Sequence, residues 1–256
     1  MIPSALNQVQ EIAGRSERLA IFLDYDGTLT PIVSHPEKAL LSDSMRRTLQ
    51  ALAMQTPVTI LSGRDLDDVR NRIAIDGIVY AGSHGFDIAG PRGLQRQEGT
   101  EFLPALDVAE KELRERLADS AGALIERKRF SIAVHYRKVM ESDFPKLERA
   151  VSEVAARHRE LRRMDGKKVY ELLPDIDWDK GKAVLWLLET LGLDRADVRS
   201  IYIGDDQTDE DAFRALGRRG VGILVSEKPR HTAASYSLKD PREVDRFLRE
   251  LAATLT

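Results

Sequence analysis

The 256-residue sequence contains no cysteine, which excludes disulfide bonds and thiolate metal sites. No apolar run approaches the ~18 residues that a membrane-spanning helix requires, and the amino terminus lacks the continuous apolar core of a signal peptide. Neither charge is in large excess, because 39 Lys and Arg stand against 42 Asp and Glu. A nucleic-acid-binding domain normally carries a basic surface. We therefore expect a cytoplasmic protein that binds neither nucleic acid nor a membrane.

What the chain does contain is a set of short apolar runs, each followed by polar residues or a turn. With 42% hydrophobic residues, the sequence can bury a full core. Helical patterns alternate with these runs, and such alternation is typical of βαβ units with a parallel sheet. The predicted strands are residues 19–23, 58–61, 78–81, 199–203 and 222–225, and a terminal helix is predicted over 241–253.

The pattern changes between residues 103 and 175. A helix, two strands, a second helix and two further strands are predicted there, with the last two strands joined by a hairpin turn at Asp165 and Gly166. We therefore expect an inserted α+β domain over 103–175, which interrupts a core domain formed by residues 1–102 and 176–256.

Several predicted strands of the core end in side chains that suit phosphoryl chemistry. Asp24 and Asp26 follow the first strand, Ser62 the second, and Asp205 a later one. Parallel strands would bring these ends to one edge of the sheet, where ligands bind in open α/β folds. Carboxylates gathered there repel one another unless a proton or a cation neutralises them. Because all the ligands would be oxygens, Mg²⁺ is the favoured cation.

The order of four motifs makes the interpretation specific. DYDGTL at 24–29, SGR at 62–64, DKGK at 179–182 and GDDQTDED at 204–211 resemble the four motifs of the haloacid dehalogenase superfamily of phosphatases. Over about residues 19–225, including IERKRFSIAVHYR in the insertion, the chain is similar to the trehalose-6-phosphate phosphatases. The resemblance implies a Rossmann-like core with an inserted cap of the C2 type, and trehalose 6-phosphate as the substrate.

The resemblance also implies catalytic roles. Asp24 would be the nucleophile that forms an aspartyl-phosphate, and Asp26 would protonate the leaving sugar oxygen and then activate water. Ser62 would hydrogen-bond the phosphoryl oxygens. Lys180 would balance the charge between nucleophile and phosphate.

By the same resemblance, Mg²⁺ would be bound by Asp24, by the main-chain carbonyl of Asp26 and by Asp205. Asp209 belongs to this metal site, and the resemblance places it behind the metal ligands, where it would orient them. Asp206 would act in the same way.

Substrate contacts are expected from both domains. In the core these are Gly63, Arg64 and His84. In the insertion Glu126, Lys128 and Glu171 match cap positions that contact sugar hydroxyls in the trehalose-phosphate enzymes. The sequence departs from the family at Leu173, where members commonly carry an arginine.

Alternative interpretations accompany these assignments. His84 could instead hold its loop through main-chain hydrogen bonds, and the three cap residues could form an ordinary cross-strand charge arrangement. Another sugar phosphatase, acting on sucrose 6-phosphate or a glucosylglycerate phosphate, is one alternative function, and a non-catalytic sugar-phosphate sensor is another. The sequence carries no signal for oligomerisation, and we expect a monomer.

Overall fold

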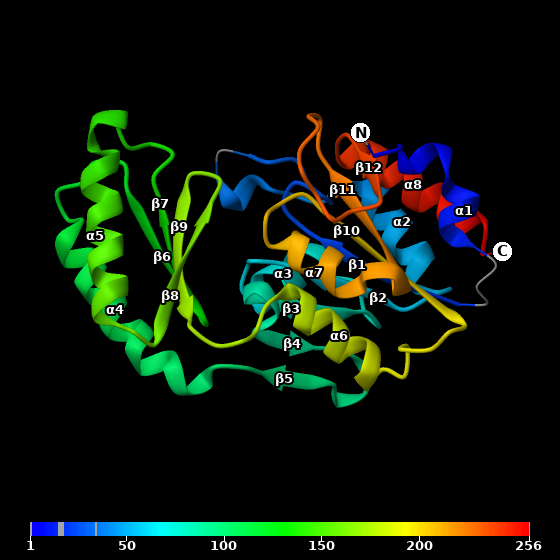
Figure 1. Ribbon diagram of the computed structural model, residues 1–256, viewed down its shortest axis with the longest axis horizontal. Coiled ribbons are helices and arrows are strands. Elements are labelled where there is room, and N and C mark those ends of the chain that lie inside the picture. The colour runs from blue at the N-terminus through cyan, green and yellow to red at the C-terminus, as the bar shows by residue number, and fades with distance from the viewer. Residues whose placement is uncertain (1, 15–17, 34, 256) are drawn as a thin grey trace. The chain divides into compact units, whose positions relative to one another are not determined.

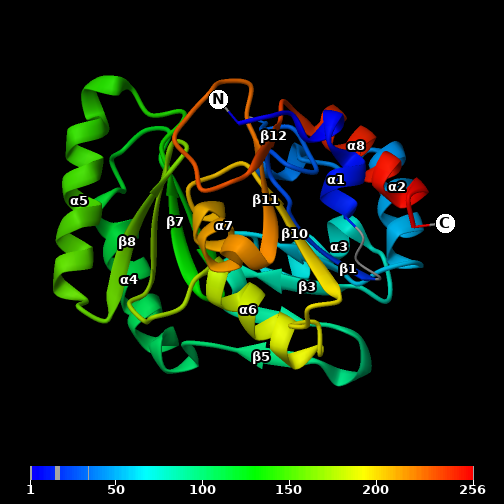
Figure 2. The same ribbon diagram turned by 45° about the vertical axis from the view of Figure 1, so that its right-hand side comes forward.

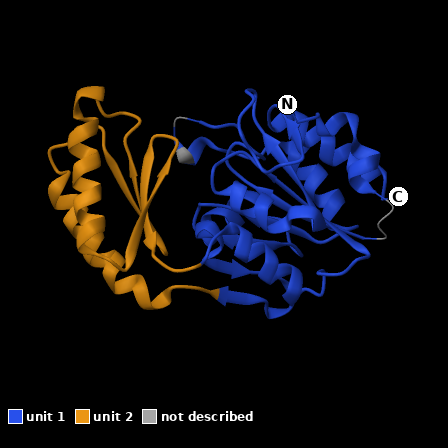
Figure 3. Ribbon diagram, in the orientation of Figure 1, with its two compact units in different colours: residues 1–96, 178–256 blue, residues 97–177 orange. Residues whose placement is uncertain are grey.

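The computed structural model describes residues 2–14, 18–33 and 35–255. The chain forms two compact units (Figure 3). The first combines Met1–Arg96 with Trp178–Thr256, and the second is Gln97–Asp177. The second unit is wider than the expected insertion of 103–175, since the residues before its first helix, Phe102 among them, pack with its own core.

The first unit contains an eight-stranded sheet in the order β12-β11-β10-β1-β2-β3-β4-β5. Every pair from β12 to β3 is parallel, and β4 runs antiparallel to β3. The predicted parallel sheet is therefore confirmed. The strands are β1 (Arg18–Asp24), β2 (Val58–Leu61), β3 (Val79–Gly82), β4 (Asp87–Ala89), β5 (Gln95–Gln97), β10 (Val198–Gly204), β11 (Gly220–Val225) and β12 (Tyr236–Leu238).

Helices cover both faces of this sheet (Figures 1 and 2). On one face lie α1 (Val9–Ala13), α2 (Asp43–Ala53), α3 (Leu66–Ile73) and α8 (Pro241–Ala253), and on the other lie α6 (Lys180–Thr190) and α7 (Asp209–Leu216). In β1, Ile21 and Leu23 enter the first core while Ala20 and Phe22 enter the second. Burial on both faces explains why this strand is a continuous apolar run in the sequence.

The second unit has its own antiparallel sheet and core. Its strands, in the order β6-β7-β9-β8, are β6 (Leu124–Lys128), β7 (Ser131–His135), β9 (Val169–Pro174) and β8 (Leu161–Gly166). Apolar side chains of α4 (Leu103–Arg116) and α5 (Phe144–Arg157) pack against this sheet. The predicted order of two helices and four strands is therefore present.

Two sequence-based expectations need correction. The hairpin does not turn at Asp165 and Gly166, because strand pairing continues to Gly166 opposite Val169 and the turn falls on Lys167 and Lys168. Lys168 takes up the left-handed conformation, with φ of 65°. Furthermore β4, β5, β12 and α1 had not been predicted. Each is five residues long or shorter, too short for hydrophobic periodicity to register.

Short 3-10 turns complete the connections between these elements. They are Ala5–Asn7, Pro36–Lys38, Ser83–Gly85, Pro91–Gly93, Thr100–Phe102, Glu141–Asp143 and Gly217–Arg219. Among the described helices, none is both long and apolar enough to cross a membrane.

Side-chain caps determine where three of the helices begin. The Ser42 hydroxyl accepts the Met45 N–H at the start of α2, and the Asp240 carboxylate accepts two main-chain N–H groups at the start of α8. At the start of α6, Asp179 accepts the Lys182 N–H at 2.9 Å. Such caps contribute about 1 kcal/mol each. The Asp179 cap places Lys180 in the first turn of α6.

A carboxylate joins helices α2 and α8. Asp245 on α8 accepts hydrogen bonds from the hydroxyls of Ser44 and Thr48 on α2, both at 2.6 Å, and from Arg249 at 2.9 Å. Burial opposes ionisation of Asp245, but the two hydroxyls and Arg249 outweigh it and lower its pKa. The ionised form is therefore the one that the folded protein stabilises.

We predict that Asp245→Asn lowers the free energy of unfolding by about 2 kcal/mol at pH 7, because hydrogen bonds to a buried charge are lost. The folded-state pKa is below the ordinary value of about 3.9, so this stabilisation is present above pH 4 and is lost as the pH falls through the folded-state pKa. Urea unfolding between pH 7 and pH 3.5 measures it. Glu250→Gln on the exposed side of α8 is the control, and an equal effect of both variants would contradict the assignment.

Candidate active site

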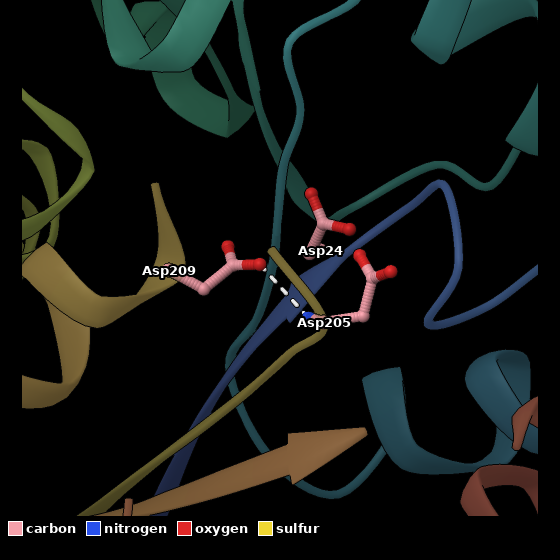
Figure 4. A group of neighbouring side chains, drawn as sticks. All are labelled: Asp24, Asp205 and Asp209. Carbon is pink, nitrogen blue, oxygen red and sulfur yellow. Dashed lines mark hydrogen bonds between the residues drawn. The ribbon is translucent and has the colours of Figure 1, made fainter. Parts of the chain in front are cut away.

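Three buried carboxylates meet at the carboxyl-terminal edge of the sheet. Asp24 ends β1, Asp205 follows β10, and Asp209 begins α7. Oxygens from all three lie within 4.8 Å of one another, and the residues are 5%, 6% and 0% exposed. Figure 4 shows the three side chains next to one another, with Asp209 bound to the main-chain nitrogen of Asp205. Adjacency of β1 and β10 brings together residues that are about 180 positions apart in the chain.

Lys180 lies between two of these carboxylates. Its Nζ atom donates to Asp24 Oδ1 and to Asp209 Oδ1, both at 2.7 Å, and its side chain is 2% exposed. Burial favours the neutral amine, but the charges of Asp209 and Asp24 outweigh it and raise the pKa of Lys180. Lys180 is therefore a fixed positive charge against the end of β1.

The negative charge of Asp24 is the one that this cluster disfavours. Burial raises its pKa, Lys180 opposes that shift, and the charges of Asp209 and Asp205 raise the pKa further. One ammonium thus faces three carboxylates. A divalent cation beside Asp24 and Asp205 would neutralise the excess, and an all-oxygen donor set is the one that suits Mg²⁺.

Asp209 differs from the other two in how its oxygens are used. Oδ1 accepts from Lys180 and from the Tyr202 hydroxyl at 2.7 Å, and Oδ2 accepts from the main-chain N–H groups of Asp205 and Asp206 at 2.9 and 2.8 Å. A carboxylate offers about four lone-pair sites, and four donors occupy them. Asp209 therefore holds Lys180 and the loop that carries Asp205.

Sequence reasoning had not identified Tyr202. It lies inside an apolar strand and is fully buried, and a buried tyrosine hydroxyl normally has a hydrogen-bond partner. That requirement was the available signal, although it does not identify the partner.

Two glycines make room for the carboxylates. A Cβ atom on Gly27 would lie 2.2 Å from Asp205 Oδ2, and Gly27 has a φ of 87°. A Cβ atom on Gly204 would lie 2.3 Å from Asp209 Cγ. Larger residues at either position would displace these side chains, so packing requires both glycines, and the positive φ of Gly27 favours glycine there as well.

Asp26 points its carboxylate toward a different partner. Arg64 binds it with two hydrogen bonds, from Nε to Oδ2 at 2.7 Å and from an η nitrogen to Oδ1 at 2.8 Å. The Asp26 side chain is 38% exposed. The two acids of DYDGTL are therefore separated, with Asp24 buried against Lys180 and Asp26 accessible beside Arg64.

The ends of the second and third strands place Ser62 and His84. Ser62 is 1% exposed, and its hydroxyl accepts the Arg64 N–H at 3.1 Å. The His84 N–H donates to the Ser62 carbonyl at 2.8 Å. A Cβ atom on Gly63 would lie 2.6 Å from the His84 ring. The imidazole is therefore packed on Gly63, in a loop held by main-chain hydrogen bonds.

In the second unit, the three residues expected to bind sugar share one face of the sheet. Glu126 and Glu171 lie on either side of Ala133 in register. Glu171 Oε1 accepts from Lys128 at 2.9 Å and from the Ser131 hydroxyl at 2.6 Å. Strand alternation places Lys128 on the face of Glu126. This face carries charged groups, whereas the opposite face packs on α4 and α5.

Two further residues, His135 and Leu173, lie beside these charged groups. Glu126 lies 2.8 Å from the His135 ring, and that hydrogen bond, opposed by burial and assisted by Lys128, lowers the pKa of Glu126. Leu173 lies two residues beyond Glu171 on the same face and is 1% exposed. Arg162 stands opposite Leu173 on β8.

Comparison with known proteins points to one family. A family model described as trehalose-phosphatase matches residues 22–242. A probable trehalose-phosphate phosphatase of Arabidopsis thaliana is 44% identical, with 97% of this chain and 72% of that protein covered. A trehalose 6-phosphate phosphatase of Zea mays is 42% identical, with 98% and 74% covered.

Solved structures share the fold. The C-terminal domain of a C. albicans trehalose-6-phosphate phosphatase superposes with a TM-score of 0.86 at 24% identity, over 99% of this chain and 98% of that one. A haloacid dehalogenase-like hydrolase from Bacteroides thetaiotaomicron superposes with a TM-score of 0.67 at 19% identity, over 91% and 98%. The fold is therefore that of the haloacid dehalogenase-like hydrolases.

We predict that Asp209→Ala destabilises the protein by about 3–5 kcal/mol, because it removes one partner from a buried ion pair and leaves buried donors unsatisfied. Chemical denaturation measures the loss. Asp211→Ala on the same helix removes a partly exposed partner of Arg214 and is expected to cost less than about 0.5 kcal/mol. If the free energy of unfolding of Asp209→Ala equalled that of the wild type, the four hydrogen bonds would contribute little to stability.

Proposed function

Because the chain belongs to the trehalose-phosphatase family of phosphoric monoester hydrolases, we propose that it hydrolyses trehalose 6-phosphate to trehalose and inorganic phosphate. The observation that carries the proposal is the buried arrangement of Lys180 between Asp24 and Asp209 beside Asp205. It presents one carboxylate, held by an ammonium, at the sheet edge where ligands bind in this fold class.

In the proposed mechanism, Asp24 attacks phosphorus and the bond from phosphorus to the sugar oxygen breaks. Asp26 gives its proton to that oxygen, which leaves as a sugar hydroxyl. Asp26 then takes a proton from water as the water attacks the aspartyl-phosphate, and phosphate is released from Asp24. Two acids are required because the nucleophile must be ionised while the acid carries a proton.

Ser62 and Lys180 would act on the phosphoryl group. The Ser62 hydroxyl accepts the Arg64 N–H, an arrangement that leaves its own proton to donate to a phosphoryl oxygen. Lys180 holds Asp24 in place and adds positive charge where the phosphoryl charge arrives. Such preorganised groups stabilise charge in a transition state.

Mg²⁺ would be held by Asp24, Asp205 and the main-chain carbonyl of Asp26. Burial raises the pKa of Asp24 and the charges of Asp209 and Asp205 raise it further, and a cation at this position would offset both effects. When bound, the cation would neutralise charge between the nucleophile and the phosphoryl oxygens. Both oxygens of Asp209 already accept hydrogen bonds, and one of them accepts the main-chain N–H of Asp206. Asp209 would therefore position the loop that carries Asp205 rather than bind the cation.

Residues 103–175 would form the cap over a core made of residues 1–102 and 176–256. Glu126, Lys128 and Glu171 would contact the sugar hydroxyls, with His84 and Gly63 on the core side. The position of Glu126, Lys128 and Glu171 on one charged face of the sheet supports this role, because acceptor carboxylates suit polyol hydroxyls. A monomer in the cytoplasm remains our expectation from the sequence.

Phosphate release from a panel of sugar phosphates tests the substrate assignment. We predict at least a tenfold preference for trehalose 6-phosphate in kcat/KM, about 1.4 kcal/mol in transition-state binding, over sucrose 6-phosphate and glucosylglycerate phosphate. The Glu171→Gln variant should raise KM for the preferred sugar phosphate and leave KM for p-nitrophenyl phosphate unchanged. A smaller preference would refute the assignment. No turnover of any phosphate would favour a sensor.

Metal removal tests the cation site. EDTA is expected to abolish activity, and Mg²⁺ to restore it. At a hundredfold excess over Kd, Mg²⁺ should stabilise the fold by about 2.7 kcal/mol and raise Tm by about 5–11 °C. Asp205→Asn should remove the Tm shift, whereas Asp211→Asn should retain it. Full activity in EDTA would contradict the proposal.

A further inference from the structure

Both oxygens of the proposed acid are held by a single side chain. Arg64 meets Asp26 in the two-bond geometry that matches a guanidinium to a carboxylate, at 2.7 and 2.8 Å. Two parallel bonds fix the plane of the carboxyl group, whereas one bond would let it rotate. The direction in which the remaining lone pairs of Asp26 point is therefore set by Arg64.

Arg64 is in turn held from behind by helix α3. Its second η nitrogen donates to Asp68 Oδ2 at 2.8 Å, and Asp68 accepts from Arg72 Nε at 2.8 and 2.9 Å. Arg72 also donates to the main-chain carbonyls of Glu37 and Ala39. Four side chains of alternating charge thus connect the acid to the helix and to the loop that follows β1.

Arg64 is more deeply buried than Asp26, as expected if Arg64 holds Asp26 in place. The Arg64 side chain is 10% exposed, while that of Asp26 is 38% exposed. Arg64 also lies over the Tyr25 ring, 5.4 Å from its centre. The inner partner is packed and charged, and the outer one is accessible.

We propose that Arg64 is a positioning residue that fixes the Asp26 carboxyl group for proton transfer to the leaving oxygen, with Asp68 holding Arg64 in place. This role takes the place of the substrate contact expected for Arg64 from the sequence. It rests on the acid role proposed for Asp26. Fixing a reacting group in orientation contributes to rate, and the contribution is largest where the leaving group most needs a proton.

The test compares two leaving groups. The alkyl substrate is the sugar phosphate that the wild type hydrolyses fastest, whichever that is, and the aryl substrate is p-nitrophenyl phosphate, whose leaving group needs little protonation. Arg64→Met removes the charge and all donors, Arg64→Lys keeps the charge without the two-bond geometry, and Asp68→Asn loosens Arg64. Asp26→Asn is the reference, and Arg70→Met, an exposed arginine on α3, is the matched control.

For the alkyl substrate, Arg64→Met should lower kcat about 100-fold, within the range of general acid catalysis. KM should change less than about threefold, because no substrate contact is lost. The loss on p-nitrophenyl phosphate should stay below about tenfold, and Asp26→Asn should show the same imbalance. Arg64→Lys should recover part of the loss, Asp68→Asn should show a smaller loss of the same kind, and Arg70→Met should match the wild type.

Other results would overturn the inference. A rise in KM on both substrates with kcat retained would make Arg64 a phosphate ligand. Equal kcat losses for Arg64→Met on both substrates, while Asp26→Asn keeps its imbalance, would reduce Arg64 to a structural role and leave the proposed function intact. Equal losses for Asp26→Asn itself would refute the acid role and the inference together.

Discussion

The buried ion pairs of Lys180 with Asp24 and Asp209 are the interaction on which the catalytic edge depends. Removing such charges from water costs several kcal/mol per ion unless each finds a close partner. The three residues come from the end of β1, the start of α6 and the start of α7. They meet only when β1 pairs with β10 and the two helices pack on the same face of the sheet. The site is therefore complete only in the folded core.

The environments of the two acids in DYDGTL differ in a way that suits the proposed division of roles. Asp24 is enclosed, faces an ammonium and stands beside other carboxylates, which suits the proposed role of a nucleophile near a cation. Asp26, two residues later, is half-buried, with both carboxylate oxygens bound by Arg64. Gly27 allows the chain to turn between these surroundings and leaves space for Asp205. A short segment thus provides two carboxylates with different partners.

The second unit uses a different principle. Its antiparallel sheet packs apolar side chains on α4 and α5 and leaves the other face to charged residues, since alternate residues point to opposite faces. Register across Ala133 aligns Glu126 with Glu171. The pairing of β7 with both neighbours therefore determines which charges stand together, as the parallel pairing of β1 does in the first unit.

The sequence alone predicted the parallel sheet, the inserted α+β unit and the strand ends at which Asp24, Ser62 and Asp205 lie. Short apolar runs followed by turn residues are local signals, and parallel strands by their nature end at one edge of a sheet. Only the tertiary structure decided the partners. The four hydrogen bonds on Asp209, the hydroxyl of Tyr202 among them, and the pairing of Arg64 with Asp26 join side chains from separate elements. The pairing of Gly166 with Val169 likewise joins two strands, and it places the hairpin turn on Lys167 and Lys168 instead of Asp165 and Gly166. Such contacts depend on packing and register across elements, and no local pattern encodes them.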